Sequence, residues 1–237
     1  MNKKYLLVKH SEGWNVDRVS QWMQKRGYAF DYCYPASGNN FPEPAQYSGV
    51  IVFGGAFSAN DHTEHEWVRQ EYSFIEKTLM AELPFFGICL GAQMLAKLHG
   101  ASVSTHPEQI KEIGFHRIDP TEHSGAFLSE PMRIMQWHSE GFDLPIGAKL
   151  LATNEDFENQ AFSLGSKVVG VQFHPEVNPA VLKLWHERNK TRPKGVLTEE
   201  QRVEQMADAV LLDAQVTAWL DDFLNYWTAE SVETVPS

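Results

Sequence analysis

The stretch Pro84-Phe-Phe-Gly-Ile-Cys-Leu-Gly-Ala-Gln93 decides which fold the chain can adopt. Residues 84–88 are apolar and predict a buried strand, and residues 90–98 have the apolar spacing of a helix. The turn between them has the order Gly87-x-Cys89-x-Gly91, with a glycine on either side of the cysteine. Such glycines permit the sharp strand-to-helix turn known as a nucleophile elbow, which occurs in α/β folds.

Strand and helix segments alternate before this turn. We expect strands over 5–8, 28–34 and 49–53, and helices over 16–26 and 64–80, with Asp61 as the cap of the second helix. This alternation predicts parallel strands that helices cover on both faces. The half of the chain after Ala101 is richer in strands, which we expect over 112–118, 132–136, 149–153, 160–164 and 168–173.

Two helices are expected near the end of the sequence, over 179–189 and from about 199 to 227, the second behind a linker over 191–197. Thr198 and Gln201 have the spacing of a capping box. The second helix has an apolar stripe at helical spacing, made of Met206, Val210, Leu211, Ala214, Ala218, Leu220, Phe223, Leu224 and Trp227. We therefore predict a domain over 1–190, with the linker and amphipathic helix of 191–237 packed on it. Binding of a partner protein by this helix is the alternative.

The composition excludes several classes of protein. The 237 residues, 43% of them hydrophobic, suffice for one domain or at most two small ones. The 31 acidic residues outnumber the 20 basic ones, and the net charge of −11 argues against binding of nucleic acid. Two cysteines are too few for a disulfide scaffold, and the apolar stretch 83–96 is too short to span a membrane. Because the first residues lack the apolar region of a signal peptide, we expect a cytoplasmic protein.

Cys89 is the candidate nucleophile. The helix that follows it points its N-terminal amides and dipole at the sulfur, which would stabilise a thiolate. A thiolate nucleophile also needs a base and an orienting group, and Gln172-Phe-His174-Pro-Glu176 offers both. In an extended backbone the side chains of His174 and Glu176 point the same way. The alternatives are an ordinary buried cysteine, and a strand-end histidine beside a solvated glutamate.

Gly54 and Gly55 are candidates for binding an oxyanion. They follow a predicted strand, at the carboxyl edge of the sheet where the active sites of α/β proteins form. The amide of Gly55 can face a developing oxyanion there, together with the amide of Leu90 just after the nucleophile. A tight turn that needs small residues is the alternative reading of the glycine pair.

The motifs taken together resemble a known family. They are Gly54-Gly55, Gly87-Ile-Cys89-Leu-Gly91-Ala-Gln93, Trp137-His-Ser-Glu140 and Gln172-Phe-His174-Pro-Glu176. The combination resembles the class I (triad) glutamine amidotransferases, in particular free-standing proteins similar to the glutaminase domain of GMP synthetase, over about residues 5–185. The resemblance implies a three-layer, flavodoxin-like α/β fold, in which helices cover both faces of a mostly parallel sheet. Here a long C-terminal helix is added.

The resemblance also implies a role for each matched residue. Cys89 would attack the side-chain amide of glutamine and form a γ-glutamyl thioester, with His174 as general acid and base and Glu176 as its orienter. The family's oxyanion hole matches Gly55 and Leu90, and its substrate contacts match Gln93, Ser139 and Glu140.

These matches predict an enzyme that hydrolyses the γ-amide of glutamine or of a related γ-glutamyl compound. No ATP-binding loop of the G-x-x-x-x-G-K-[ST] type follows Glu176. Either a separate synthetase subunit therefore supplies the ammonia acceptor, or the protein works alone, as a γ-glutamyl peptidase would. A binding or regulatory module that has kept the fold but lost turnover is the alternative of another class. We expect no cofactor. We also expect no metal, because no ligand set has zinc spacing and the histidines and acids of 61–66 diverge around the start of a helix.

Overall fold

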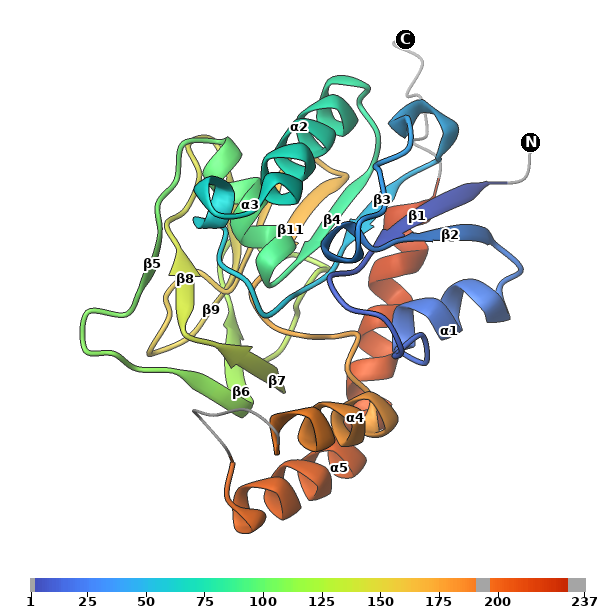
Figure 1. The fold of residues 1–237 in the computed structure, drawn as a ribbon. Coiled ribbons are helices and arrows are strands. Elements are labelled where there is room, and N and C mark those ends of the chain that lie inside the picture. The colour runs from blue at the N-terminus through green and yellow to red at the C-terminus, as the bar shows by residue number, and fades with distance from the viewer. Residues whose placement is uncertain (1–2, 191–196, 230–237) are drawn as a thin grey trace, which may run out of the picture.

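The computed structural model describes residues 3–190 and 197–229, and a large sheet lies at its centre (Figure 1). Within these residues the sheet has nine strands in the order β2-β1-β3-β4-β11-β10-β9-β6-β7. The strands are β1 Lys4–Val8, β2 Ala29–Cys33, β3 Val50–Val52, β4 Phe85–Ile88, β6 Glu112–Pro120, β7 Met132–His138, β9 Lys149–Thr153, β10 Ala161–Leu164 and β11 Val168–Val171. The helices are α1 Arg18–Lys25, α2 Glu66–Met80, α3 Leu90–Leu98, α4 Pro179–Asn189 and α5 Glu199–Thr228.

The sheet is parallel at one end and antiparallel at the other. The neighbours β2, β1, β3, β4 and β11 run parallel, in the flavodoxin-like order. From β11 onward the pairs with β10, β9, β6 and β7 are antiparallel. Helix α1 joins β1 to β2 and α2 joins β3 to β4, while a loop with two 3₁₀ turns joins β2 to β3. In contrast, β10 and β11 are joined by a short turn, as an antiparallel pair allows. The expected α/β architecture is confirmed, with a mixed sheet.

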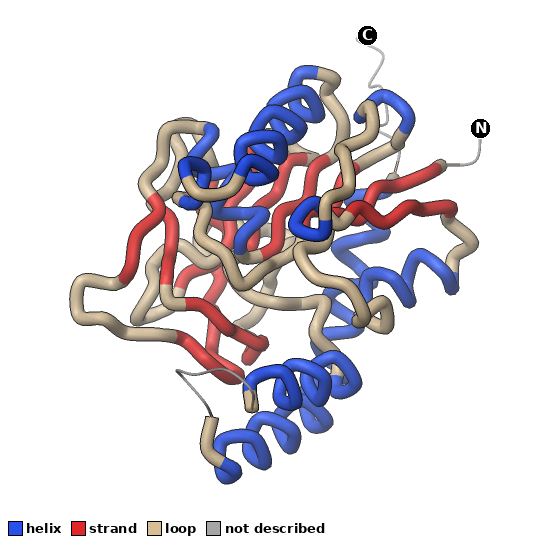
Figure 2. The backbone as a smooth tube through the Cα atoms, viewed as in Figure 1, coloured by secondary structure: helices blue, strands red, loops and turns tan. Residues whose placement is uncertain are grey.

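Helices cover both faces of this sheet, which gives three layers (Figures 1 and 2). Alternate strand residues divide between two buried clusters, as the period of two in a strand requires. Leu7 and Ile51 belong to the cluster that contains residues of α1, α4 and α5. Leu6 and Val50 belong to the cluster that contains residues of α2 and α3.

Helix α5 begins as predicted, and Thr198 and Gln201 form the capping box. Its second half is buried against the sheet through Leu220, Phe223, Leu224 and Trp227. The predicted stripe is wrong at Val210 and Leu211, which are 67% and 74% exposed, and at Ala214 and Ala218, which are also exposed. In its first half, α5 packs against α4 and β6 and buries Gln205 and Ala209. The buried face there is therefore narrower and partly polar.

One further expectation on local structure is wrong, and one pair of strands was not predicted. Asp61 does not cap α2, because it begins a separate 3₁₀ turn (Asp61–Thr63) and its carboxylate accepts a hydrogen bond from the Ser58 amide. His65 occupies the capping position of α2. A small antiparallel pair, β5 (Val103–Thr105) and β8 (Glu140–Phe142), was not expected. Each of its strands is only three residues long, too short for a clear alternation of apolar and polar residues.

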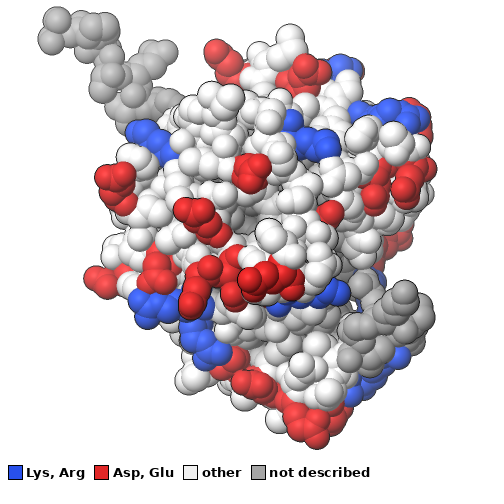
Figure 3. All heavy atoms as spheres, turned by 90° about the vertical axis from the view of Figure 1, so that its left-hand side faces the viewer, with Lys and Arg blue, Asp and Glu red and all other residues white. Residues whose placement is uncertain are grey.

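The surface reflects the acidic composition. Figure 3 shows Asp and Glu side chains gathered across one face of the molecule, in keeping with the net charge of −11. Among the described residues, none of the helices is both long enough and apolar enough to cross a membrane. The predicted linker over 191–197 lies outside the described residues except for Leu197.

Candidate active site

Cys89 occupies the strained turn between β4 and α3. Its backbone has φ 51° and ψ −105°, a conformation that costs a residue with a side chain free energy and that clusters at functional sites. Its amide donates to the Val171 carbonyl at 2.7 Å, which ties the turn to the end of β11. A Cβ on Gly87 would lie 2.7 Å from the Gly91 carbonyl oxygen, and one on Gly91 would collide with the Val52 carbonyl oxygen. Both glycines are therefore required for α3 to pack this close to the sheet.

His174 and Glu176 lie just beyond the end of β11, beside this turn. The His174 Nδ1 is 2.8 Å from Glu176 Oε1, and both side chains are buried. Burial alone would lower the pKa of His174, but the charges of Glu176 and Cys89 and hydrogen bonds to both outweigh it and raise this pKa to about 10. Since Glu176 occupies Nδ1, Nε2 is the ring nitrogen left for the sulfur. The structure thus brings together the three residues expected to form a triad.

Other residues hold the ring of His174 and the backbone around it in place. Its backbone amide donates to the Met135 carbonyl at 2.8 Å, and the edge-to-face ring of Trp185 has its centroid 5.0 Å away. The backbone amide of Arg18 donates to the Glu176 carbonyl at 2.9 Å, and the Arg18 guanidinium donates to the carbonyls of Pro175 and Val177. These contacts hold the segment that carries the base and its orienter.

Gln172 was not singled out from the sequence, yet it contacts the candidate nucleophile. Its Nε2 donates to Cys89 Sγ at 3.7 Å, and its Oε1 accepts from Gln93 Nε2 at 3.2 Å. Gln93 Nε2 also donates to the Glu140 carbonyl at 2.9 Å. The Gln93 amide group is therefore engaged by the protein, and a contact between Gln93 and a substrate would fall to its Oε1 oxygen.

Ser139 and Glu140 lie where β7 passes into β8, and both are partly buried. The Glu140 side chain accepts from Ser58 Oγ at 3.1 Å, and the Glu140 backbone carbonyl contacts His138 Nδ1 at 3.1 Å. Glu140 and Gln93 are thus brought into contact, whereas Ser139 is placed beside them by the chain.

The Gly54-Gly55 pair follows β3 and lies over the other site residues. A Cβ on Gly54 would be 2.7 Å from His174 Cε1 and 3.2 Å from Cys89 Cβ, so only glycine fits there. On the other side of the loop, a Cβ on Gly55 would be 2.8 Å from His10 Cβ. Leu90 is the first residue of α3, where helix amides have no partner within the helix. Of the two expected oxyanion donors, Leu90 directly follows Cys89, and Gly55 is joined to Gly54, which lies against Cys89.

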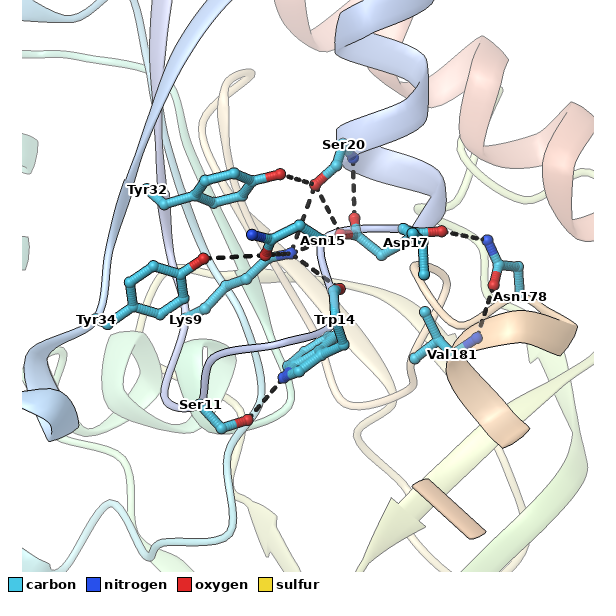
Figure 4. Close-up of polar contacts among 11 residues, drawn as sticks. Lys9, Ser11, Trp14, Asn15, Asp17, Ser20, Tyr32, Tyr34, Asn178 and Val181 are labelled. Carbon is cyan, nitrogen blue, oxygen red and sulfur yellow. Dashed lines mark hydrogen bonds and ion pairs between the residues drawn. The ribbon is translucent and has the colours of Figure 1, made fainter. Parts of the chain in front are cut away.

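A buried polar network lies in the loop between β1 and α1 (Figure 4). Lys9, the residue after β1, is fully buried, and its Nζ is 2.6 Å from Asp17 Oδ2. Asp17 also caps α1, because its other oxygen accepts from the Ser20 amide at 2.9 Å. Burial lowers the pKa of Lys9, and the charge of Asp17 opposes that effect.

One group of side chains has the geometry of metal ligands. Atoms of Glu112, His116 and Asp156 lie within 4.8 Å of one another. The Glu112 carboxylate is already engaged, since it accepts from Gln160 Nε2 at 3.0 Å and from Asn154 Nδ2 at 2.5 Å, and its Oε2 is 2.9 Å from His138 Nε2. Glu112 serves here as a hydrogen-bond acceptor, and a metal would have to displace these donors.

Sequence and structure comparisons agree on one family. A family model described as glutamine amidotransferase class-I matches residues 15–190. A solved glutamine amidotransferase from Thermotoga maritima is 30% identical, with a TM-score of 0.89 over 97% of this chain and 100% of that one.

Three curated proteins illustrate the range of similar sequences. A glutamine amidotransferase-like protein of Salmonella typhimurium is 31% identical over 72% of this chain and 74% of its own length. A GMP synthase of Porphyromonas gingivalis is 32% identical over 62% of this chain but 28% of its own length. Gamma-glutamyl peptidase 5 of Arabidopsis thaliana is 27% identical over 58% of this chain and 57% of its own length.

Proposed function

Because the chain belongs to the class I glutamine amidotransferase family, we propose that it hydrolyses the γ-amide of glutamine or of a related γ-glutamyl compound. The observation that carries this proposal is the strained turn at Cys89, with the buried His174 and Glu176 pair beside it. A buried structural cysteine has no need of a base and an orienter, so this arrangement favours catalysis over a pure binding role.

In the first half of the proposed reaction, Cys89 Sγ bonds to the γ-carbonyl carbon of the substrate. The carbonyl oxygen becomes an oxyanion that the amides of Gly55 and Leu90 stabilise. The C–N bond then breaks, and His174 gives its proton to the leaving nitrogen, so that ammonia or an amine departs and a γ-glutamyl thioester remains.

In the second half, water replaces the departed amine. His174 takes a proton from the water, whose oxygen attacks the thioester carbon, and the C–S bond breaks to release glutamate. Sulfur leaves as the thiolate, paired with protonated His174, or regains the proton from it. Glu176 keeps the ring oriented through Nδ1 in both halves.

The similar proteins are compatible with two leaving groups, ammonia and the amine of a γ-glutamyl peptide. Similarity to a GMP synthase over 28% of its length suggests that ammonia is handed to a separate synthetase subunit in the cytoplasm. Similarity to a γ-glutamyl peptidase over 57% of its length instead favours a protein that works alone on γ-glutamyl peptides. The acyl-enzyme chemistry is the same in both cases.

The test is release of glutamate from glutamine and from a panel of γ-glutamyl amides and peptides by the purified protein. Cys89→Ala should abolish release, whereas Cys33→Ala should leave it intact. Cys33 is a matched control, because it is also buried but lies in strand β2, and burial raises the pKa of its thiol to about 11. The donor with the highest kcat/KM would identify the substrate class.

Labelling with a glutamine-like electrophile separates catalysis from binding. Rapid modification of Cys89 at neutral pH, with Cys33 unmodified, is expected of an activated nucleophile. Absence of Cys89-dependent release from every donor, together with slow labelling, would overturn the proposal in favour of a binding module.

A further inference from the structure

Another buried histidine–carboxylate pair lies against the Gly54-Gly55 loop. His10 follows β1, and Glu71 belongs to α2; they are 4% and 0% exposed. The His10 Nε2 is 3.1 and 3.0 Å from the two Glu71 carboxylate oxygens. The other ring nitrogen, Nδ1, is 3.1 Å from the Gly54 carbonyl oxygen. This pair plays no part in the triad.

The partners of His10 determine its protonation. A backbone carbonyl can only accept a hydrogen bond, and so can an ionised carboxylate. With an ionised Glu71, both ring nitrogens of His10 donate, and the ring is an imidazolium paired with a carboxylate. Burial would lower the pKa of His10, but Glu71 and the Gly54 carbonyl outweigh burial and raise it.

The peptide bond between Gly54 and Gly55 links the His10 contact to the candidate oxyanion hole, because its carbonyl oxygen contacts His10 and its N–H is the expected donor. The bond is trans and planar, so its carbonyl oxygen and its N–H point in opposite directions. The oxygen faces His10, while Cys89 and His174 lie against the Cα of Gly54. Holding the oxygen toward His10 directs the Gly55 N–H away from the imidazolium, as its expected role as an oxyanion donor requires.

We propose that His10, held by Glu71, is a positioning residue that orients and polarises the Gly54–Gly55 peptide as an oxyanion donor. This inference rests on the proposed function and adds a residue that positions one of its oxyanion donors. A charge-assisted hydrogen bond at the carbonyl end of a peptide strengthens its N–H as a donor at the other end. The loop cannot shift toward His10, because Gly55 already lies closely against the ring.

The test compares two double variants, His10→Ala/Glu71→Gln and His10→Asn/Glu71→Gln. Replacing Glu71 in both avoids leaving a buried carboxylate without its partner. The Asn side chain can place an amide donor near the position of Nδ1 and is expected to restore part of the activity that Ala loses. His186→Ala is the matched control, because His186 is also 4% exposed but contacts Gln205 of α5.

Three measurements distinguish positioning from a general structural effect. For the Ala variant, kcat for glutamate release should fall by up to about 10²–10³-fold, the usual effect of losing one oxyanion donor, with KM nearly unchanged. Binding of glutamate γ-semialdehyde should weaken in parallel, because Cys89 adds to its carbonyl carbon and the resulting oxygen occupies the same hole. Alkylation of Cys89 by iodoacetamide creates no oxyanion and should keep its rate.

The outcomes separate the inference from the function on which it rests. An unchanged kcat in the Ala variant would overturn the inference alone, as would an equal loss of kcat, aldehyde binding and alkylation. Absence of Cys89-dependent glutamate release by the wild-type protein would overturn both. Loss of kcat and aldehyde binding with intact alkylation, and partial recovery in the Asn variant, is the expected result.

Discussion

The two oxygens of the Glu176 carboxylate have different surroundings. Oε1 accepts from His174, whereas Oε2 is buried without a hydrogen-bond partner among the residues that the structure describes. The Glu176 carboxylate therefore accepts a hydrogen bond from the His174 ring alone among the described residues, and its negative charge stabilises the protonated form of His174. We expect Glu176 to matter through His174 and not through the substrate.

This difference predicts an order of damage. His174→Ala removes the general acid and base, and we expect kcat to fall by about 10⁴-fold, the upper end of what such a group contributes. Glu176→Gln leaves the base present with a neutral acceptor beside it, so the loss should be smaller than for His174→Ala, by about 10–100-fold. Initial rates of glutamate release check this order, and a larger loss in Glu176→Gln would mean that the two roles are assigned the wrong way round.

The same pair predicts a pH dependence of stability. In the folded protein the pKa of His174 is raised to about 10, from 6.5 in the unfolded chain. Between these values the folded state binds a proton that the unfolded state lacks, so the free energy of unfolding contributed by His174 falls as the pH rises. The contribution is complete below pH 6.5.

Urea unfolding of the wild-type protein and of Glu176→Gln measures this effect. The wild-type protein should lose its advantage over the variant as the pH rises from about 6.5 toward 10, because the variant lacks the charge that raises this pKa. A constant difference across that range would contradict the expectation.

Some of these residues could be predicted from the sequence, and others could not. Cys89 lies in a recognisable turn with a glycine on either side, and His174 and Glu176 are close enough in sequence for chain spacing to bring them together. His10 and Glu71 lie 61 positions apart, and only the fold brings them together. A signal did exist, since Lys9 and His10 are charged or polar residues directly after an apolar strand, at the edge of the sheet where sites form.

The junction of β1 with α1 depends on the buried ion pair of Lys9 and Asp17. Asp17→Asn keeps an acceptor for the cap of α1 but removes the charge that compensates the fully buried ammonium. We expect the free energy of unfolding to fall by about 3–5 kcal/mol, as for other broken buried pairs. The double variant Lys9→Met/Asp17→Asn should recover much of this loss, since it leaves no unpaired charge.

An exposed pair provides the control for that measurement. Asp119→Asn removes the partner of Arg117, whose side chain is 65% exposed, and it should change stability far less than Asp17→Asn. Equal effects of the two substitutions would show that burial of the pair is not what makes Lys9 and Asp17 important.

Elements with a strong pattern were predicted well, and weakly patterned ones were not. Helix α3 was expected over the residues that form it, because the glycines and apolar run of 84–93 leave few alternatives. The β5–β8 pair has too few residues for a recognisable period, and the start of α2 lacks a capping side chain. In α5 the helical period was visible, but which face is buried changes along its length, as neighbouring elements change from α4 to the sheet.

The residues of the candidate site lie at the carboxyl edge of the parallel strands. His10 follows β1, the Gly54-Gly55 loop follows β3, Cys89 follows β4, and His174 follows β11. These strands are neighbours in the sheet, in the order β1-β3-β4-β11. The fold therefore places four segments, far apart in sequence, along one edge, which is where open α/β sheets bind their ligands.

We propose that α5 and the sheet form one cooperative unit. Trp227 is fully buried, its Nε1 donates to the Lys167 carbonyl at 3.0 Å, and its ring lies 5.8 Å from that of Tyr5 in β1. Trp227→Ala should lower the free energy of unfolding of the whole molecule by about 3–5 kcal/mol, because it empties a large space under the sheet. Leu211→Ala, on the exposed side of the same helix, should change it by no more than about 0.5 kcal/mol.

Unfolding followed by two probes decides between one unit and two. Far-ultraviolet circular dichroism reports helices and strands, and near-ultraviolet circular dichroism reports the aromatic packing around Trp227. In one cooperative unit both probes give the same transition, and Trp227→Ala shifts both to lower denaturant together. If α5 only rests on a sheet that is stable without it, the variant would instead show an early, partial loss of helix signal, followed by an unshifted main transition. The single shifted transition is expected, because residues of α5 belong to the same buried cluster as those of β1, β3 and β4.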